Sequence, residues 1–216
     1  MAKSNSSKRK YNSTRRQAQA GETHRQILEA AYKLFIEHGY AGATIEAIAK
    51  EAGVALKTVY AVFKNKWKIL VTLLNNSSST SGEENIPMLE RAGPQAVAQE
   101  RDQRRQLQIF AQVIANNMVG AAYISEIMQV AAKTEADVDK MVQNLNKQRW
   151  QHMAVAVQQI ASNGPLRERA NEAYATDIVW TLTSPEVFLL LTRDRGWSKE
   201  KYAEWLADSL IRALLP

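Results

Sequence analysis

The stretch from Ile45 to Val62, IEAIAKEAGVALKTVYAV, constrains the fold more than any other part of the chain. Its small and apolar residues have the spacing of two short helices that cross near a right angle and are joined by a glycine turn. These residues are Ile48, Ala49, Ala52, Gly53, Val54, Val59 and Val62. Ala49 permits close approach of the helices, and Gly53 can adopt a turn conformation that strains other residues. The pattern predicts a helix-turn-helix whose second helix lies in the DNA major groove, although an ordinary helical hairpin would show a similar pattern.

The flanking residues extend this motif into a small helical domain. A first helix is predicted from Glu22 or Thr23 to Gly39, because one of its faces is apolar at helical spacing. That face consists of Ile27, Ala31, Leu34 and Phe35. Thr44 is placed to cap the next helix with its hydroxyl. The second helix of the motif is predicted from Ala55 to Phe63, and a further helix continues through residues 67–73.

Positive charge is concentrated at the same end of the chain. Residues 1–80 contain 13 basic and 5 acidic side chains, whereas residues 81–216 contain 15 basic and 17 acidic ones. Attraction to phosphates supplies much of the affinity of proteins for DNA, so this asymmetry supports DNA binding by the N-terminal part. The first dozen residues are rich in Ser, Asn and Lys, and we expect them to be disordered in the free protein.

The sequence from Gly39 to Leu70, GYAGATIEAIAKEAGVALKTVYAVFKNKWKIL, resembles the N-terminal domain of the TetR (tetracycline-repressor-like) family of bacterial regulators. The resemblance covers roughly residues 23–73, about a quarter of the chain. It implies an all-α protein in which a three-helix helix-turn-helix domain precedes a helical domain for ligand binding and dimerisation. The expected division is a basic flexible arm (1–21), the DNA-binding domain (22–74) and the helical domain (75–216). It also implies a homodimeric, cytoplasmic regulator of a palindromic operator, usually a repressor, which is released from DNA by a small ligand and is associated with the nucleoid when bound.

The residues predicted to face DNA lie mainly on the second helix of the motif. They are Arg16, Thr44, Ala55, Leu56, Lys57, Thr58, Tyr60, Ala61, Lys64 and Lys66. By resemblance, Thr44, Thr58, Tyr60 and Lys66 occupy positions that commonly touch phosphates. Lys57 can donate to guanine O6 and N7, and Ala55, Leu56 and Ala61 can touch thymine methyl groups, although Leu56 is equally suited to packing within its own domain. The family usually has Ser or Thr at the position of Ala55, where the side chain caps the second helix of the motif. Ala55 departs from this pattern, since an alanine side chain cannot cap a helix.

Beyond Gly93 the chain is predicted to be helical throughout. Pro94 suits the first turn of a helix that reaches Asn116, and a shorter helix follows around residues 124–131. A long helix is expected to end at Asn163-Gly164-Pro165, and another to run from Leu166 to Thr183. Ser184-Pro185-Glu186 is typical of a helix start and precedes a short segment that is apolar nearly all round and is therefore expected to be buried. Ser198 is placed to cap the last helix.

The last helix suggests self-association. Its polar residues form one narrow stripe, and its apolar residues cover most of the remaining circumference. The apolar set is Tyr202, Trp205, Leu206, Leu210, Ile211, Leu214 and Leu215. One domain core covers only one side of a terminal helix, so we expect a two-fold dimer through residues 166–215 and loss of assembly on charging Leu206 or Leu210. The alternative is a helix buried deep in its own domain.

Large flexible and aromatic side chains between residues 114 and 183 are candidates for the wall of an effector pocket. The residues selected are Met118, Tyr123, Trp150, Met153 and Trp180. Methionines and flat aromatic rings suit an apolar small molecule, although each residue also suits an ordinary helical core. The net charge of residues 81–216 is close to zero, so nothing in it demands an anionic ligand.

The sequence gives little support for catalysis. His24, His38 and His152 have no metal-ligand spacing with other ligand types, and there is no phosphate-binding glycine loop or nucleophile motif. The chain has no cysteine and no long apolar run, so we expect no cofactor, no metal and no membrane span. Two hypotheses remain: a ligand-responsive repressor, and a DNA-binding regulator that is controlled by a protein partner. A cavity among the helices of residues 94–183 would favour the first.

Overall fold

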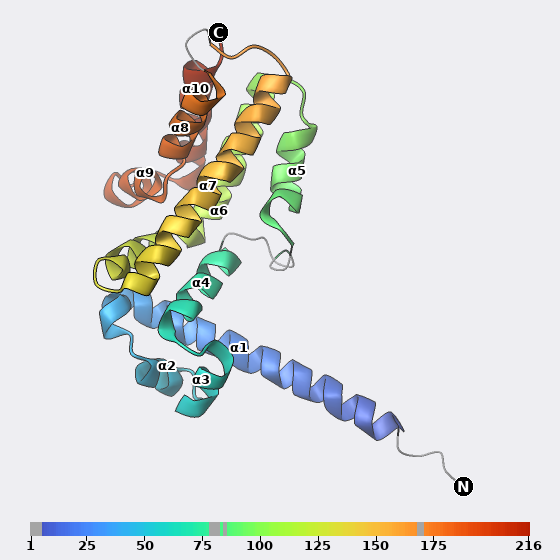
Figure 1. The fold of residues 1–216 in the computed structure, drawn as a ribbon, viewed down its shortest axis with the longest axis vertical. Helices are drawn as coiled ribbons and strands as arrows, with labels where there is room; N and C mark the ends of the chain where they lie inside the picture. The colour runs from blue at the N-terminus through green and yellow to red at the C-terminus, as the bar shows by residue number, and fades with distance from the viewer. Residues whose placement is uncertain (1–5, 78–82, 84–85, 168–170) are drawn as a thin grey trace. The chain divides into compact units, whose positions relative to one another are not determined.

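The computed structural model describes residues 6–77, 83, 86–167 and 171–216, and these residues form helices without any strand (Figure 1). The predicted all-α fold is therefore confirmed. Packing divides the chain into two compact units, Met1–Leu73 and Leu74–Pro216. Residues 78–82 and 84–85, shortly after the predicted division between residues 74 and 75, lie outside the described residues.

Unit 1 contains α1 (Ser6–Gly42), α2 (Ile45–Glu51), α3 (Leu56–Phe63) and the first part of α4 (Lys66–Ser77). The apolar face predicted for the first helix is confirmed, since Ile27, Ala31, Leu34 and Phe35 are all buried. His24 contributes to the same core, because its ring lies 4.8 Å from the ring of Phe63 on α3.

The start of α1 differs from the prediction. Helix begins at Ser6, not at Glu22 or Thr23, so the segment predicted as a flexible arm is helical from Ser6 onward. Residues 6–20 contain neither proline nor glycine and include several good helix formers, so nothing in them stops the helix. The predicted break at Gly39 is present as a kink, since Gly39 has a φ of 66° and a ψ of −178° within α1.

Unit 2 is built around α6 (Gln103–Ala132), which packs against α5 (Ala92–Gln99), α7 (Ala136–Ser162), α9 (Pro185–Leu189) and α10 (Lys199–Leu214). α8 (Glu172–Leu182) packs against α7 and α10, and the short 3-10 turn η1 (Met88–Glu90) precedes α5. By length and composition alone, α6 is the one helix among the described residues that is apolar enough to span a membrane. Twelve of its residues are buried within unit 2, where it is the central helix.

Several helix limits in unit 2 also differ from the predictions. The sequence predicts one helix from Pro94 to Asn116 and a shorter helix after it. The structure instead has the short α5 and the single long α6, which are separated at residues 100–102. Asp102 caps α6 by accepting a hydrogen bond from the Arg105 amide at 2.7 Å. The helix predicted from Leu166 starts only at Glu172, after the cap residue Asn171. The caps predicted at Ser184 and Ser198 are confirmed.

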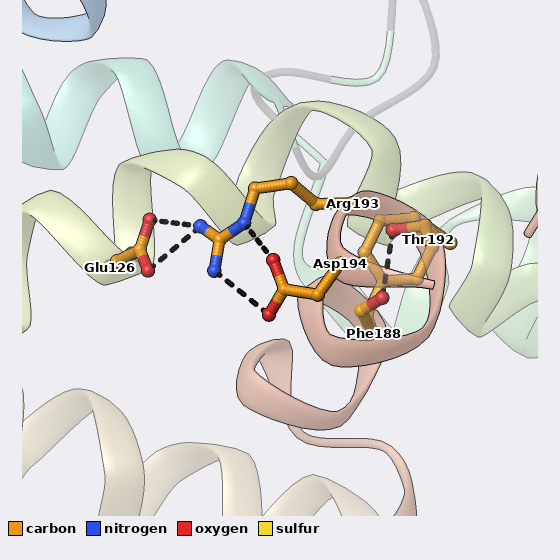
Figure 2. Close-up of polar contacts among 5 residues, drawn as sticks. All are labelled: Glu126, Phe188, Thr192, Arg193 and Asp194. Carbon is orange, nitrogen blue, oxygen red and sulfur yellow. Dashed lines mark hydrogen bonds and ion pairs between the residues drawn. The ribbon is translucent and has the colours of Figure 1, made fainter. Parts of the chain in front are cut away.

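The segment after α9 continues into η2 (Leu190–Asp194), a short π-helical stretch. Arg193 in η2 donates to both carboxylate oxygens of Glu126 on α6 at 3.0 and 2.8 Å, and its Nε donates to Asp194 at 2.7 Å (Figure 2). The hydroxyl of Thr192 donates to the carbonyl of Phe188 (Figure 2). These contacts hold η2 against α6. The sequence predicts that this apolar segment is buried. Phe188 and Leu189 are buried, but Leu190 is 55% exposed, so the prediction holds for only part of the segment.

The last helix lies deep in its own domain. Tyr202, Leu206, Leu210 and Leu214 are completely buried, and Ile211 and Leu215 nearly so, by α6, α8 and η2 of the same chain. The argument that the apolar breadth of this helix requires a second subunit is therefore wrong, and the alternative of a core helix is correct. The helix is covered on more than one side because α6 and α8 both pack against it.

Candidate nucleic-acid interface and effector cavity

The turn between α2 and α3 has the geometry that the glycine pattern predicts. Gly53 has a φ of 66° and lies just after the C-cap of α2. Its amide donates to the carbonyl of Lys50 at 3.2 Å, and the amide of Val54 donates to the carbonyl of Ala49 at 3.0 Å. This pair of hydrogen bonds is a Schellman motif, which ends one helix and redirects the chain. Ala49 and Val59 are buried where the two helices meet.

The outer face of α3 brings together most of the residues predicted to face DNA. Leu56, Lys57, Tyr60 and Ala61 are exposed, and at about 100° per residue they occupy roughly 140° of the helix circumference. Lys64 follows, exposed, at the C-cap. Val59 and Phe63 are buried next to this face. The helix therefore presents a face with two cations and a phenol, together with apolar groups, as a reader of base edges and phosphates requires.

The remaining predicted residues lie outside this exposed face of α3. Ala55 is the N-cap residue of α3, and, as predicted for alanine, its side chain makes no capping hydrogen bond. Thr58 is half-buried. The hydroxyl oxygen of Thr44 accepts from the Ala47 amide at 3.1 Å, which leaves its proton available for another acceptor. Arg16 is exposed on α1.

Lys66 is held by its own domain. Its ammonium donates to the carbonyl of Tyr40 at 2.7 Å and lies 4.0 Å from the centre of the Tyr40 ring. The side chain therefore fastens the end of α1 to the start of α4. The ammonium has three N–H donors, so its predicted contact with a phosphate stays a prediction.

Unit 2 contains a cavity of about 750 Å³, a size that suits a small-molecule ligand. Its wall comes from the end of α4, the segment before α5, and from α5 to α9. Much of the wall is apolar, with Phe110, Ile114, Met118, Met128 and Met153 among the lining residues.

Three of the five residues predicted to form a pocket wall line this cavity: Met118, Met153 and Trp180. The other two do not, so the predictions for Tyr123 and Trp150 are wrong. Tyr123 packs against the core of unit 2. Trp150 lies on the exposed side of α7, and its indole N–H donates to Asp177 on α8 at 2.9 Å.

Sequence reasoning missed Arg149, which also lines the cavity. Its guanidinium lies 4.4 Å from the centre of the Trp180 ring, and its Nη1 donates to the Trp180 carbonyl at 2.9 Å and to the Thr183 hydroxyl at 3.3 Å. Burial lowers the pKa of Arg149 to about 10, so the group stays positively charged at neutral pH. Burial likewise lowers the pKa of His152, another lining residue, which favours its neutral form. A signal was present in the sequence, since Arg149, His152, Met153 and Ala156 share one helix face.

The fold and the α2–α3 geometry define a helix-turn-helix protein with an attached all-helical domain. Residues 27–73 match the profile of the bacterial regulatory proteins of the tetR family. This match confirms the resemblance to the TetR family that was predicted from the sequence. The prediction that the chain is not an enzyme agrees with this match to a family of regulators.

The alignments with curated relatives cover between 22% and 29% of this chain. The chain is 48% identical over 48 residues to the fatty acid metabolism regulator protein of Bacillus subtilis (strain 168), which is 22% of this chain and 25% of that protein. The alignment thus spans about a quarter of the relative's length.

Two solved structures share the fold along most of the chain. The crystal structure of NalD, the secondary repressor of the MexAB-OprM multidrug efflux pump in Pseudomonas aeruginosa, has a TM-score of 0.66 at 22% identity and covers 90% of this chain and 97% of its own. FadR from Bacillus subtilis in complex with stearoyl-CoA has a TM-score of 0.67 at 18% identity and covers 87% and 97%.

Proposed function

We propose that this protein is a homodimeric transcriptional repressor that binds a palindromic operator and leaves it when a small, mostly apolar molecule occupies the cavity of unit 2. The observation that carries the proposal is the pairing, in one chain, of an exposed α3 face with a ligand-sized cavity. The cavity favours this hypothesis over a regulator controlled only by a protein partner. FadR, whose structure contains stearoyl-CoA, supports it by analogy. We further propose that the protein acts in the bacterial cytoplasm, at the nucleoid.

The proposed DNA contacts follow from the face of α3. Lys57 is exposed in the first turn of α3, the end of the helix that approaches base edges in helix-turn-helix proteins. Tyr60 is 45% exposed and, with Lys64, is proposed to contact phosphates. Leu56 and Ala61 are proposed to touch thymine methyl groups.

Selection of bound DNA from a random pool tests both the function and these assignments. We expect the wild-type protein to enrich a palindrome with two half-sites one helical turn apart. Lys57→Met should relax the preference at one or two base pairs of each half-site, with a discrimination loss of about 1–3 kcal/mol. Lys64→Met, the matched control, should weaken binding to all selected sequences about equally. A wild-type selection without any enriched motif would refute sequence-specific regulation.

The dimer is proposed to form through the exposed sides of the C-terminal helices, because the buried side of α10 is occupied by its own domain. On α8, Tyr174 is 55% exposed and offers a large apolar ring to a partner. A two-fold dimer would pair two recognition helices with two half-sites.

Sedimentation separates assembly from folding in this proposal. We expect Tyr174→Asp to convert a micromolar dimer to a folded monomer, whereas Leu206→Lys should unfold the chain, because Leu206 has no exposed surface. Val130→Asp is the matched control, since Val130 is 57% exposed on α6, outside the proposed interface. A wild-type protein that sediments as a folded monomer at micromolar concentration would exclude the dimer.

A further inference from the structure

The cavity of unit 2 has a cationic region in an otherwise largely apolar wall. The guanidinium of Arg149 is fixed on two sides, by stacking on the Trp180 ring and by the two hydrogen bonds from its Nη1. These contacts hold the group in one orientation before any ligand arrives. A guanidinium fixed in this way is suited to bind a planar, acceptor-bearing group such as a carboxylate.

Two buried donors beside one another are left without an acceptor. The Nε of Arg149 and the Nε1 of Trp180 are buried and make no hydrogen bond to the described residues, and both side chains line the cavity. A buried donor without a partner costs free energy, and each such group requires an explanation. Both atoms are closed off from the cavity in this structure, so an acceptor brought by a ligand reaches them only when the side chains shift.

The charge of Arg149 is also not paired. No carboxylate of the described residues lies within salt-bridge distance of it, although the charge of Glu186 in α9 acts on it from further away. The other cavity-lining arginine, Arg91, is engaged by the protein, because its Nε donates to the carbonyl of Ile86 at 3.0 Å. Burial lowers the pKa of His152, on the same face as Arg149, which favours its neutral form. The charge of Arg149 therefore lies next to an apolar space without a carboxylate partner among the described residues.

We infer that the effector is an amphipathic organic acid, whose carboxylate is bound by the guanidinium of Arg149 and whose apolar body lies along the Phe110, Ile114 and Met118 side of the cavity. This inference rests on the proposed function and specifies the ligand class of the same site. It also revises the expectation that nothing demands an anionic ligand. The near-zero net charge of residues 81–216 says nothing about a single cation that the fold places beside a cavity.

Matched probes test the inference on the full-length protein. One set is decanoate, methyl decanoate and decylammonium, and a compact aromatic set is 1-naphthoate, its methyl ester and 1-naphthylmethylammonium. We expect isothermal titration to show that the acid of at least one set binds at least tenfold more tightly than its ester and its amine. If neither acid is preferred, including the case in which no probe binds, the inference is overturned.

Variants assign the preference to Arg149. Arg149→Gln keeps a hydrogen-bond donor but removes the charge, and we expect it to weaken acid binding at least tenfold while ester binding changes less than twofold. Lys147→Gln, which removes an exposed charge on the same helix outside the cavity wall, should leave both affinities unchanged. Arg149→Lys, which keeps the charge, should retain part of the preference and provides a second readout if Arg149→Gln does not fold. An acid preference that survives in Arg149→Gln would remove Arg149 from the site.

Operator binding by the same preparations separates this inference from the proposed function. If the wild type prefers the acid but binds no operator, the repressor proposal fails and the ligand class stands. If it binds an operator but shows no acid preference, the ligand class fails and the regulator stands.

Discussion

Raising monovalent salt from 50 to 200 mM will weaken operator binding by about a thousandfold. Arg16, Lys57 and Lys64 are exposed and have no carboxylate partner among the described residues. Arg25 and Lys33, in contrast, already form ion pairs with Glu22, Glu29 and Glu51. These three cations per subunit bring about six positive charges to the operator, and the release of about six condensed counterions gives a loss of about this size.

Fluorescence anisotropy of a labelled operator over a salt series gives the slope directly. Lys64→Gln should reduce the slope by roughly two, one contact from each subunit. Lys140→Gln is the charge-matched control, because Lys140 is an exposed residue of unit 2 and its loss should leave the slope unchanged. An affinity that barely responds to salt would contradict phosphate anchoring by unit 1.

The helix-turn-helix could be predicted from the sequence because its determinants are local. Gly53, Val54 and Ala49 are within a few residues of one another, and the turn that they form depends on hydrogen bonds between near neighbours. The caps at Ser184 and Ser198 were predictable for the same reason. The break at residues 100–102 contains no proline or glycine, so its one signal was the capping residue Asp102.

The cavity could not be predicted at the level of single residues. Trp150 and Met153 are three positions apart on α7. Met153 lines the cavity, whereas the indole N–H of Trp150 donates a hydrogen bond to Asp177 on the outer side of α7. The side on which each residue lies depends on how α7 packs against α6 and α8, which composition does not encode. Arg149 is 31 residues from Trp180, and only the packing of α7 on α8 brings their side chains together.

The burial of α10 shows a related limit. An apolar surface that covers most of a helix can be buried by a partner subunit or by several helices of the same domain. Here α6 and α8 supply the cover, so Leu206 and Leu210 belong to the core. The number of neighbours around a helix is a property of the tertiary fold, and the pattern of one helix does not reveal it.

An effector that releases the operator will bind about a hundredfold more weakly to the protein saturated with operator than to the free protein. The proposed switch is a shift between two arrangements of the dimer, of which only one presents its recognition helices to successive major grooves. A hundredfold loss of DNA affinity corresponds to a coupling free energy of about 2.7 kcal/mol, and thermodynamic linkage requires the same factor for the ligand. Titrating the effector calorimetrically with and without saturating operator measures this factor.

Ser125→Phe, which places a ring in the cavity wall, should abolish the ligand response and retain operator binding, whereas Val119→Phe on the exposed side of α6 should leave both intact. Equal ligand affinity in the two titrations would exclude the switch, because a ligand that does not distinguish the two arrangements cannot shift the population between them.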